Sequence, residues 1–333
     1  MWIHSKCNKL NKKDYDRLTK EHDDIPFICL CCISDNLPFS TLSDRNFDIA
    51  VTKGINYLLD NDNDLEFLNN HQLEITKKFQ AILNNKPYEN DDDDALQPPV
   101  CSYYSIDEFS KAKFNPNKSF SILHFNIHSI QRHIDELRTL LLMLNFNFDF
   151  IAITESKLYK GKEPSTNILL EGYNEPFHCN TEATKGGVLL YASNKFNIIP
   201  RPDLQTYSPK EVESVFIEVV NHNSKNDIVG VIYRHHSIDK SLFIDDHISP
   251  LLSKLKLENK KNIFIAGDLN LNLLKINSDE DVSNFFDIIT NNFLLPTISL
   301  PTRITNSTKT LIDNIFTNMI NPDAISGNLN VGI

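Results

Sequence analysis

Short apolar runs separated by amphipathic stretches dominate the chain from residue 119 onward. Helices are predicted at 130–144 and 242–257, where apolar residues recur at helical spacing. Strands are predicted where β-branched and aromatic residues cluster, at 120–125, 148–153, 187–191, 215–219, 228–233 and 263–266. Continuous apolar strands are expected to be buried on both faces of their sheet. The pattern therefore predicts a layered α/β domain.

The chain before residue 119 does not show this alternation. A start rich in Cys and His occupies residues 1–34, and a polar, acidic stretch follows at 35–118. The run Asp91–Asp94 is interpreted as part of a solvated linker, because consecutive like charges rarely form a folded site. We therefore expect a remnant module at 1–34, a partly helical or disordered linker at 35–118, and a main domain at 119–333.

Composition narrows the classes of protein that fit. The 333 residues are 41% hydrophobic and 23% charged, which is typical of a folded globular chain. With 33 basic and 44 acidic residues the net charge is −11, so bulk electrostatics do not favour coating of nucleic acid. The sequence shows neither a spanning apolar run nor the apolar core of a signal peptide, so an intracellular protein is expected. Six cysteines do not indicate a disulfide framework.

Polar side chains follow four of the predicted strands, at the ends where ligands collect in layered α/β folds. These groups are Asn126, Thr154-Glu155-Ser156, Tyr233-Arg234 and Gly267-Asp268-Leu269-Asn270. A fifth residue, Asp313, lies inside an apolar run, where a buried carboxylate needs a partner. Each group alone is also explained by a turn, a cap or a rim aromatic. Their joint occurrence favours a shared site.

The residue types in these groups suit metal-assisted hydrolysis of a phosphate ester. A hard divalent ion such as Mg²⁺ prefers carboxylate oxygen and water, and Glu155 supplies a carboxylate. Asp268 is suited to orienting and deprotonating the attacking water, and Asn270 to holding the phosphorane oxygens. The sequence therefore predicts a site with separate tasks for its polar residues.

Six segments carry a family resemblance: Ile122–Asn126, Ile153–Ser156, Gly186–Val188, Val231–Arg234, Ile265–Asn270 and Ile312–Phe316. In order and spacing they resemble the endonuclease/exonuclease/phosphatase superfamily. More narrowly, they resemble the apurinic-type endonuclease domain of non-LTR (LINE-like) retrotransposons. The resemblance covers about residues 119–329. It implies a four-layer α/β sandwich, with two packed mixed β-sheets flanked by helices.

The resemblance also implies roles for individual residues. Glu155 corresponds to the metal-binding glutamate and Asn126 to the asparagine beside it. Tyr233 corresponds to the tyrosine that contacts the scissile phosphate, Asp268 to the water-activating aspartate, and Asn270 to the transition-state asparagine. The implied cofactor is Mg²⁺ or Mn²⁺. The implied partner is DNA, which members of the family nick to start target-primed reverse transcription, and the expected location is the nucleus. The implied native context is a polyprotein that also contains a reverse transcriptase.

One part of the family pattern is missing. Asp313 corresponds to an aspartate that orients a catalytic histidine, and that histidine belongs to a Ser-Asp-His motif that this sequence does not contain. The resemblance thus predicts a domain cut short, without its last strand. Loss of the histidine is expected to lower the rate by roughly 10²–10³-fold or more. Replacements are available in principle among the surplus histidines, but spacing favours none of them: His124, His128, His133, His235 and His236.

The first residues contain zinc-ligand spacings. His4 and Cys7 form a His-x₂-Cys pair, and Cys29 and Cys32 form a Cys-x₂-Cys pair. They resemble the second half of a PHD-type finger, a module found upstream of the endonuclease in some of these elements. The preceding ligand pairs are missing. A single zinc site that uses all four residues is one interpretation, and a collapsed remnant is the one we favour.

Other functions fit parts of the sequence. The chain could be a catalytically inactive remnant of the endonuclease domain, a small-molecule phosphatase or phosphodiesterase of the same superfamily, or a zinc-dependent reader module. A DNA nuclease should lose affinity as salt rises, to a degree set by its phosphate contacts. The residues suited to such contacts are Lys157, Lys160, Lys162, Lys185 and Arg234.

Overall fold

The computed structural model describes residues 77, 79–81, 100–112, 120–162, 164–182, 185–221, 224–258, 260–319 and 324–331. All of them lie in the compact unit Glu74–Ile333. The predicted zinc ligands, His4, Cys7, Cys29 and Cys32, lie outside the described residues, as does the acidic run Asp91–Asp94.

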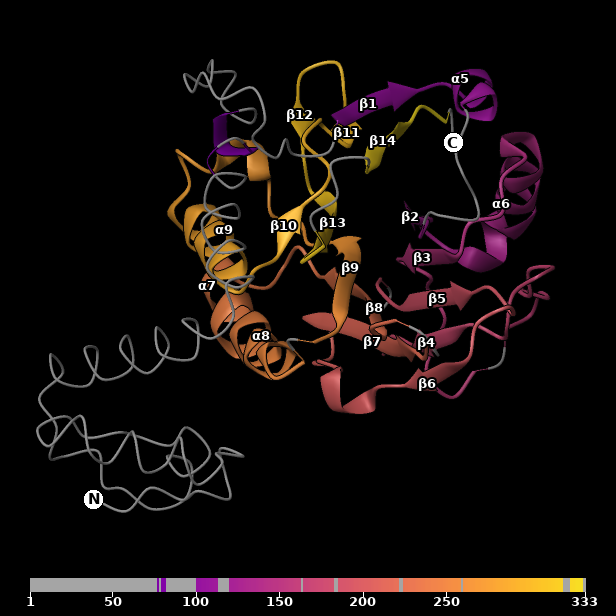
Figure 1. Cartoon of the computed structure of the whole chain (residues 1–333), viewed down its shortest axis with the longest axis horizontal. Helices are drawn as coiled ribbons and strands as arrows, with labels where there is room; N and C mark the ends of the chain where they lie inside the picture. Colours follow the sequence, from indigo (N-terminus) through magenta and orange to yellow (C-terminus); the bar gives the residue numbers. More distant parts are fainter. Residues whose placement is uncertain are drawn as a thin grey trace, which may run out of the picture. The chain divides into compact units, whose positions relative to one another are not determined.

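Two mixed β-sheets form the centre of the described part of the chain (Figure 1). The four-stranded sheet has the order β2-β3-β5-β4, with β2 Ile122–Asn126, β3 Phe150–Thr154, β4 Phe177–Cys179 and β5 Val188–Ala192. The six-stranded sheet has the order β10-β13-β9-β8-β7-β6, with β6 Ile198–Pro200, β7 Val212–Val219, β8 Asp227–Arg234, β9 Asn262–Asp268, β10 Leu295–Pro296 and β13 Asp313–Thr317.

Helices cover the outer face of each sheet. Helix α6, Ile130–Leu144, packs against the four-stranded sheet. The outer face of the six-stranded sheet is covered by α7 Lys240–Phe243, a π-helical turn at Ile244–Ile248, α8 Ser249–Lys256 and α9 Glu280–Asn291. The result is the predicted α/β sandwich, with mixed sheets flanked by helices on both outer faces. No helix among the described residues has both the length and the apolar composition that crossing a membrane requires.

Side-chain alternation explains why the central strands are apolar throughout. On β3, Ile151 and Ile153 contact α6, whereas Phe150 and Ala152 face the other sheet. Val229 and Val231 of β8 meet them from the opposite side of the layer between the sheets. Both faces of these strands are therefore buried, as their continuous apolar sequence predicts.

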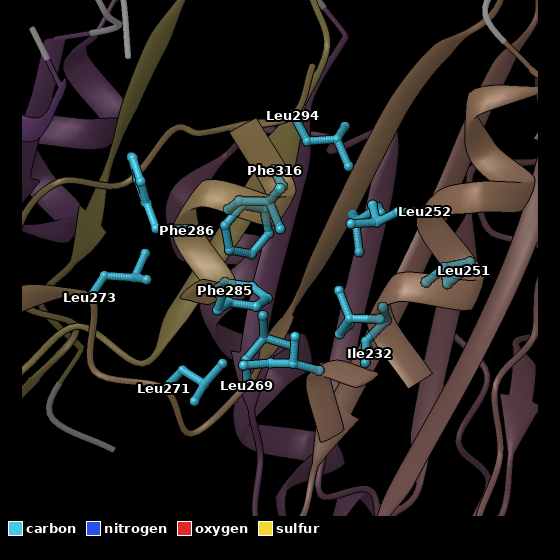
Figure 2. Packing of buried hydrophobic residues seen from close by; sticks show 14 of the residues in the cluster. Ile232, Leu251, Leu252, Leu269, Leu271, Leu273, Phe285, Phe286, Leu294 and Phe316 are labelled. Atoms are coloured by element: carbon cyan, nitrogen blue, oxygen red, sulfur yellow. The ribbon is translucent and has the colours of Figure 1, made fainter. Parts of the chain in front are cut away.

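The largest core cluster lies between the six-stranded sheet and its helices. Figure 2 shows Ile232 and Phe316 from the sheet together with Leu252 of α8 and Phe285 of α9. All four side chains are at most 4% exposed. Burial of each such side chain contributes about 1.5–3 kcal/mol, so this cluster anchors the helices to the sheet that carries most of the site.

Several elements were not predicted from the sequence. They include β4, β6 and α9, as well as β1 Val100–Tyr104 within the segment assigned to the linker, where α5 Ile106–Lys111 is a helix in a stretch described only as partly helical or disordered. Strand β1 pairs in parallel with β14, Ile325–Leu329. A short hairpin is formed by β11 Arg303–Ile304 and β12 Lys309–Thr310. The predicted helix at 130–144 coincides with α6, and the predicted helix at 242–257 corresponds to α7, the π-helical turn and α8.

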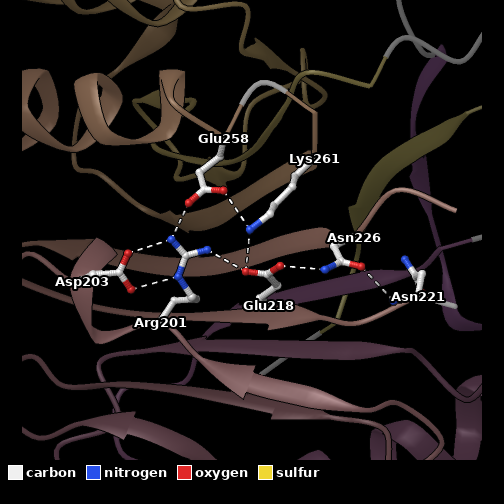
Figure 3. Close-up of polar contacts among 7 residues, drawn as sticks. All are labelled: Arg201, Asp203, Glu218, Asn221, Asn226, Glu258 and Lys261. Carbon is white, nitrogen blue, oxygen red and sulfur yellow. Dashed lines mark hydrogen bonds and ion pairs between the residues drawn. The ribbon is translucent and has the colours of Figure 1, made fainter. Parts of the chain in front are cut away.

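A charged network closes one end of the six-stranded sheet. Arg201 contacts Glu218 at 2.7 Å and Glu258 at 2.5 Å, and Lys261 bridges the same two carboxylates (Figure 3). Glu218 pairs with Ile228 at the start of β8, and six further residues of β8 span roughly 20 Å. This network therefore stabilises the sheet at the end opposite to the predicted site.

Candidate active site

The predicted site residues meet at the end of the layer between the two sheets. Inward-facing positions on β3, β8 and β9 are apolar in the middle, as with Ala152, Val231 and Ala266. Two residues further along, alternation places Thr154, Tyr233 and Asp268 on the same face. Strand pairing aligns these ends, since Tyr233 lies opposite Asp268, Asp268 opposite Asp313, and Asn126 opposite Thr154. Each strand thus contributes a polar side chain where its apolar row stops.

Asn126 connects the two sheets at this point. Its Nδ2 donates to Oδ2 of Asp268 at 2.8 Å and to Oε1 of Glu155 at 3.2 Å. The two carboxylates are held on either side of one amide donor, which reduces the repulsion between them. Because an amide nitrogen cannot bind a cation, only Oδ1 of Asn126 could serve as a metal ligand.

Glu155 is an ionised carboxylate fixed by three donors. It follows β3 in a left-handed backbone conformation, with φ of 51°. Besides Asn126, its oxygens contact the Tyr233 hydroxyl at 3.2 Å and Nδ1 of His128 at 3.0 Å. Burial opposes ionisation, but hydrogen bonds from Asn126, His128 and Tyr233 outweigh it and lower the pKa of Glu155. Glu155 therefore carries a negative charge at neutral pH.

Asp268 has the opposite electrostatic environment. Burial, followed by the nearby charge of Asp313, raises the pKa of Asp268 to about 7. Hydrogen bonds from Asn126 and from the backbone N–H of Asn270 partly oppose the shift. A carboxyl with a pKa near neutrality exchanges a proton readily at physiological pH. Of the two neighbouring carboxylates, Glu155 therefore stays ionised and Asp268 can accept and release a proton.

Asp313 is mostly buried and has a partner. Thr302 Oγ1 donates to its Oδ2 at 2.8 Å, and Nδ1 of His124 lies 3.8 Å from its Oδ1. Burial raises the pKa of Asp313 to about 6. A carboxylate in an apolar run needs a partner. For Asp313 this partner is Thr302, from the segment before β11, and His124 of β2 lies close by.

His124 was assigned no role from the sequence, yet it lies inside the site. Its Nε2 is 3.2 Å from Oγ1 of Thr154, and burial lowers the pKa of the imidazole to about 4. The ring is thus neutral at physiological pH. Its position two residues before Asn126 on a strand was the available signal, because alternation places both side chains on the same face.

Tyr233 and His128 both contact the Glu155 carboxylate. The Tyr233 ring is buried, and burial together with the Glu155 and Asp268 charges raises the pKa of its hydroxyl well above 10. Tyr233 therefore remains a donor at any physiological pH. His128 is exposed on the rim, where its Nε2 lies 3.0 Å from Nζ of Lys157. The rim beside Glu155 accordingly carries an imidazole and an ammonium group.

Asn270 and Arg234 hold the strand ends together. The Asn270 Nδ2 donates to the Arg234 carbonyl at 2.7 Å. Arg234 is 3% exposed, and its guanidinium donates to the Ile238 carbonyl at 2.5 Å and the Asn270 carbonyl at 3.3 Å. The expectation that Arg234 contacts a substrate phosphate is therefore wrong for this structure, because the side chain is buried and both of its terminal nitrogens donate to backbone carbonyls.

The fold and the site place the chain among layered α/β proteins with paired carboxylates at their strand ends. The profile of the Endonuclease/Exonuclease/phosphatase family matches residues 123–322, and the chain belongs to this family. Among curated proteins, none is matched by this sequence.

Solved structures with a similar fold include three nucleases. The endonuclease domain of TRAS1, a telomere-specific non-LTR retrotransposon, has 10% identity and a TM-score of 0.41, covering 60% of this chain and 84% of that one. The AP endonuclease LMAP from Leishmania major has 13% identity and a TM-score of 0.49, covering 72% and 89%. The 3'-5' exonuclease NExo from Neisseria meningitidis has 14% identity and a TM-score of 0.43, covering 59% and 86%. These likenesses concern the fold alone.

Members of this family generally use a divalent metal ion. The oxygen donors of this site fit an ion that binds through few protein ligands. Among the described residues no group of three or more His, Cys, Asp or Glu side chains is arranged to hold a metal ion. Mg²⁺ does not need such a cage, since it retains several waters and binds through one or two carboxylates. Glu155 accepts three hydrogen bonds, which leaves lone-pair capacity on its two oxygens.

Proposed function

We propose that this chain hydrolyses phosphodiester bonds in DNA with the help of Mg²⁺ or Mn²⁺. The observation that carries the proposal is the position of Asn126. Its amide lies between Glu155, which is ionised, and Asp268, whose pKa is raised to about 7. An anionic ligand and a proton acceptor are the two groups that metal-assisted attack of water on a phosphate requires.

Each residue has a defined task in this proposal. Glu155 would hold the metal, and the bound ion would supply positive charge that offsets the charge developing on the phosphoryl oxygens and on the leaving oxygen, whose bond to phosphorus breaks as water attacks and which then takes a proton from solvent. Asp268 accepts the proton of the attacking water, for which a pKa near 7 is well matched. The Tyr233 hydroxyl, which donates to Glu155 in this structure, stays protonated and would donate to a phosphate oxygen instead once Glu155 binds the metal. Asn270 and Asn126 hold the two carboxylates and the strand ends in register.

The narrower proposal is a role like that of non-LTR retrotransposon endonucleases. The six motif segments in order support it, and DNA nicked in the nucleus would then be the substrate. The chain would act within a polyprotein that also contains a reverse transcriptase. The competing proposals are an inactive remnant of such a domain and a small-molecule phosphatase or phosphodiesterase of the same family.

Nicking of supercoiled plasmid tests the proposal directly. The full chain is incubated with plasmid and Mg²⁺, beside Glu155→Ala and a matched control, Glu171→Ala, which removes an exposed glutamate away from the site. Nicking by the wild type and the control, but not by Glu155→Ala, supports the assigned site. Equal nicking by all three would refute the site, and no nicking by folded wild type would favour the inactive remnant.

The phosphatase alternative is separated from the DNA nuclease by its substrate. A DNA nuclease should bind duplex DNA with an affinity that falls steeply as salt rises. A small-molecule phosphatase should instead hydrolyse phosphomonoesters and show little salt dependence. The two measurements on the same preparation distinguish the two classes.

A further inference from the structure

A cleft adjoins the site through Tyr233. It has a volume of about 530 Å³, and its lining includes Tyr159, Glu182, Lys185, Lys210, His235 and His236. The His235 ring makes an edge contact with the Tyr233 ring, with centroids 4.9 Å apart. The cleft therefore begins two residues beyond the tyrosine that contacts Glu155.

One residue of the cleft lining, His235, is held by a buried hydrogen bond to Glu213. Glu213 is completely buried, and both of its carboxylate oxygens lie within 2.9 Å of Nε2 of His235. Gly186 covers the pair with φ of +101°, and a Cβ at this position would lie 2.6 Å from Nε2 of His235. The Gly186 carbonyl accepts from the backbone N–H of Lys157 at 2.9 Å, which ties the loop to the residues after Glu155. The cleft is thus built rigidly onto the site.

Two lysines on the rim of the cleft have no ion-pair partner among the described residues. They are Lys185 and Lys210, and both are exposed. The acidic residue of the lining, Glu182, is already paired with Lys160 at 2.7 Å, and this hydrogen bond lowers the pKa of its carboxyl. On a chain with a net charge of −11, the cleft is a local basic site beside the catalytic carboxylates.

We propose that this cleft, the lysine cleft, binds the nucleotide unit that adjoins the scissile phosphate on a DNA strand. This rests on the proposed function. The ammonium groups of Lys185 and Lys210 would contact the backbone phosphate as point charges. Tyr159 and His236 provide flat rings for the sugar or base. The volume falls in the range of roughly 300–1,000 Å³ that is typical of pockets for whole small molecules, so it suits a nucleotide better than a lone phosphate.

The first test of the lysine cleft is binding, which does not require catalysis. A double variant, Lys185→Gln with Lys210→Gln, is compared with Lys256→Gln, an exposed lysine at the end of α8. The affinity for a fluorescent 20-base-pair duplex is measured without metal over a series of salt concentrations. The slope of log affinity against log salt should become shallower by about two in the double variant, at about 0.9 per lost contact, and should remain unchanged in Lys256→Gln. Equal slopes in all three proteins overturn the proposal.

The second test asks whether the lysine cleft acts only on substrates that have a nucleotide next to the scissile phosphate. The substrates are a long oligonucleotide and bis(p-nitrophenyl) phosphate, a diester with no flanking phosphate. The double variant should raise KM for the oligonucleotide by at least tenfold and leave hydrolysis of the small diester unchanged. Equal losses on both substrates overturn the neighbouring-nucleotide assignment. A wild-type chain that cleaves neither substrate contradicts the proposed function, whereas the salt slopes still decide the lysine cleft.

Discussion

Asn126 and Asp268 are 142 residues apart in the sequence, and the Asn126 amide donates a 2.8 Å hydrogen bond to the Asp268 carboxylate. The same amide donates to Glu155, so a single side chain from the four-stranded sheet sets the separation of the two carboxylates. This shared amide lowers the pKa of both carboxylates, so the opposite directions of their shifts have other causes. Glu155 has three donors around it, whereas Asp268 is more deeply buried and faces the charge of Asp313.

Replacing Asn126 should therefore impair activity more than stability. Asn126→Asp places a third carboxylate between Glu155 and Asp268, where the donor now lies. We expect the nicking rate to fall by about 10²-fold or more, an effect comparable to loss of a transition-state donor. The measurement is single-turnover nicking, accompanied by thermal unfolding to verify the fold. An Asn126→Asp protein with wild-type activity would contradict the bridging role.

The unusual pKa of Asp268 should appear in the pH dependence of stability. A carboxyl with a raised pKa in the folded state contributes stability at low pH, and this contribution is lost as pH rises through about 7. The opposite effect of His124, whose pKa is lowered from 6.5 to about 4, is confined to pH values below about 6.5. From pH 6.5 to 8 the wild type should therefore lose up to about 1 kcal/mol more than Asp268→Asn.

Urea unfolding in EDTA at these two pH values measures that difference. Asp268→Asn is a suitable reference because it preserves the shape of the side chain and removes its titration. The difference in free energy of unfolding between the two proteins should change by up to about 1 kcal/mol between the two pH values, with the larger loss in the wild type. Parallel pH profiles would mean that Asp268 titrates normally in the folded protein.

A divalent metal should stabilise the folded chain through Glu155. A ligand that binds only the folded state raises its stability by about 2.7 kcal/mol at a concentration of 100 Kd. Mg²⁺ or Mn²⁺ should therefore raise the melting temperature of the wild type at pH 8, and Glu155→Gln should lose most of this increase. Glu171→Gln is the matched control, because Glu171 is exposed and lies outside the site. An equal increase in Glu155→Gln would place the metal elsewhere.

Two glycines with similar backbone conformations should respond differently to alanine. Gly186 has φ of +101° and would place a Cβ 2.6 Å from Nε2 of His235, whereas Gly172 has φ of +84° with no atom within 4 Å. Gly172→Ala should cost about 1–2 kcal/mol from backbone strain alone. Gly186→Ala should cost more than this, because it also displaces the pair formed by His235 and Glu213. Equal losses in urea unfolding would show that the pair adapts freely.

Local sequence determined the elements that carry the site. Helical spacing at 130–144 predicts α6, and apolar runs ending in polar residues predict β3, β8 and β9 together with the groups at their ends. These features depend on side-chain periodicity and on turn chemistry, which are properties of neighbouring residues. The short strands β4 and β6 escaped prediction, because three residues are too few to establish a period.

Tertiary structure decided which of these groups meet. His124 lies near Asp313, and Lys185 and Lys210 line the same cleft, although the members of each pair are distant along the chain. The Arg234 side chain is buried and bonds to a backbone carbonyl. Such contacts depend on strand order, register and the stacking of two sheets, none of which a local pattern specifies. The sequence by itself therefore determined the chemical groups at the strand ends, and the packing of the two sheets determined their charge states and their partners.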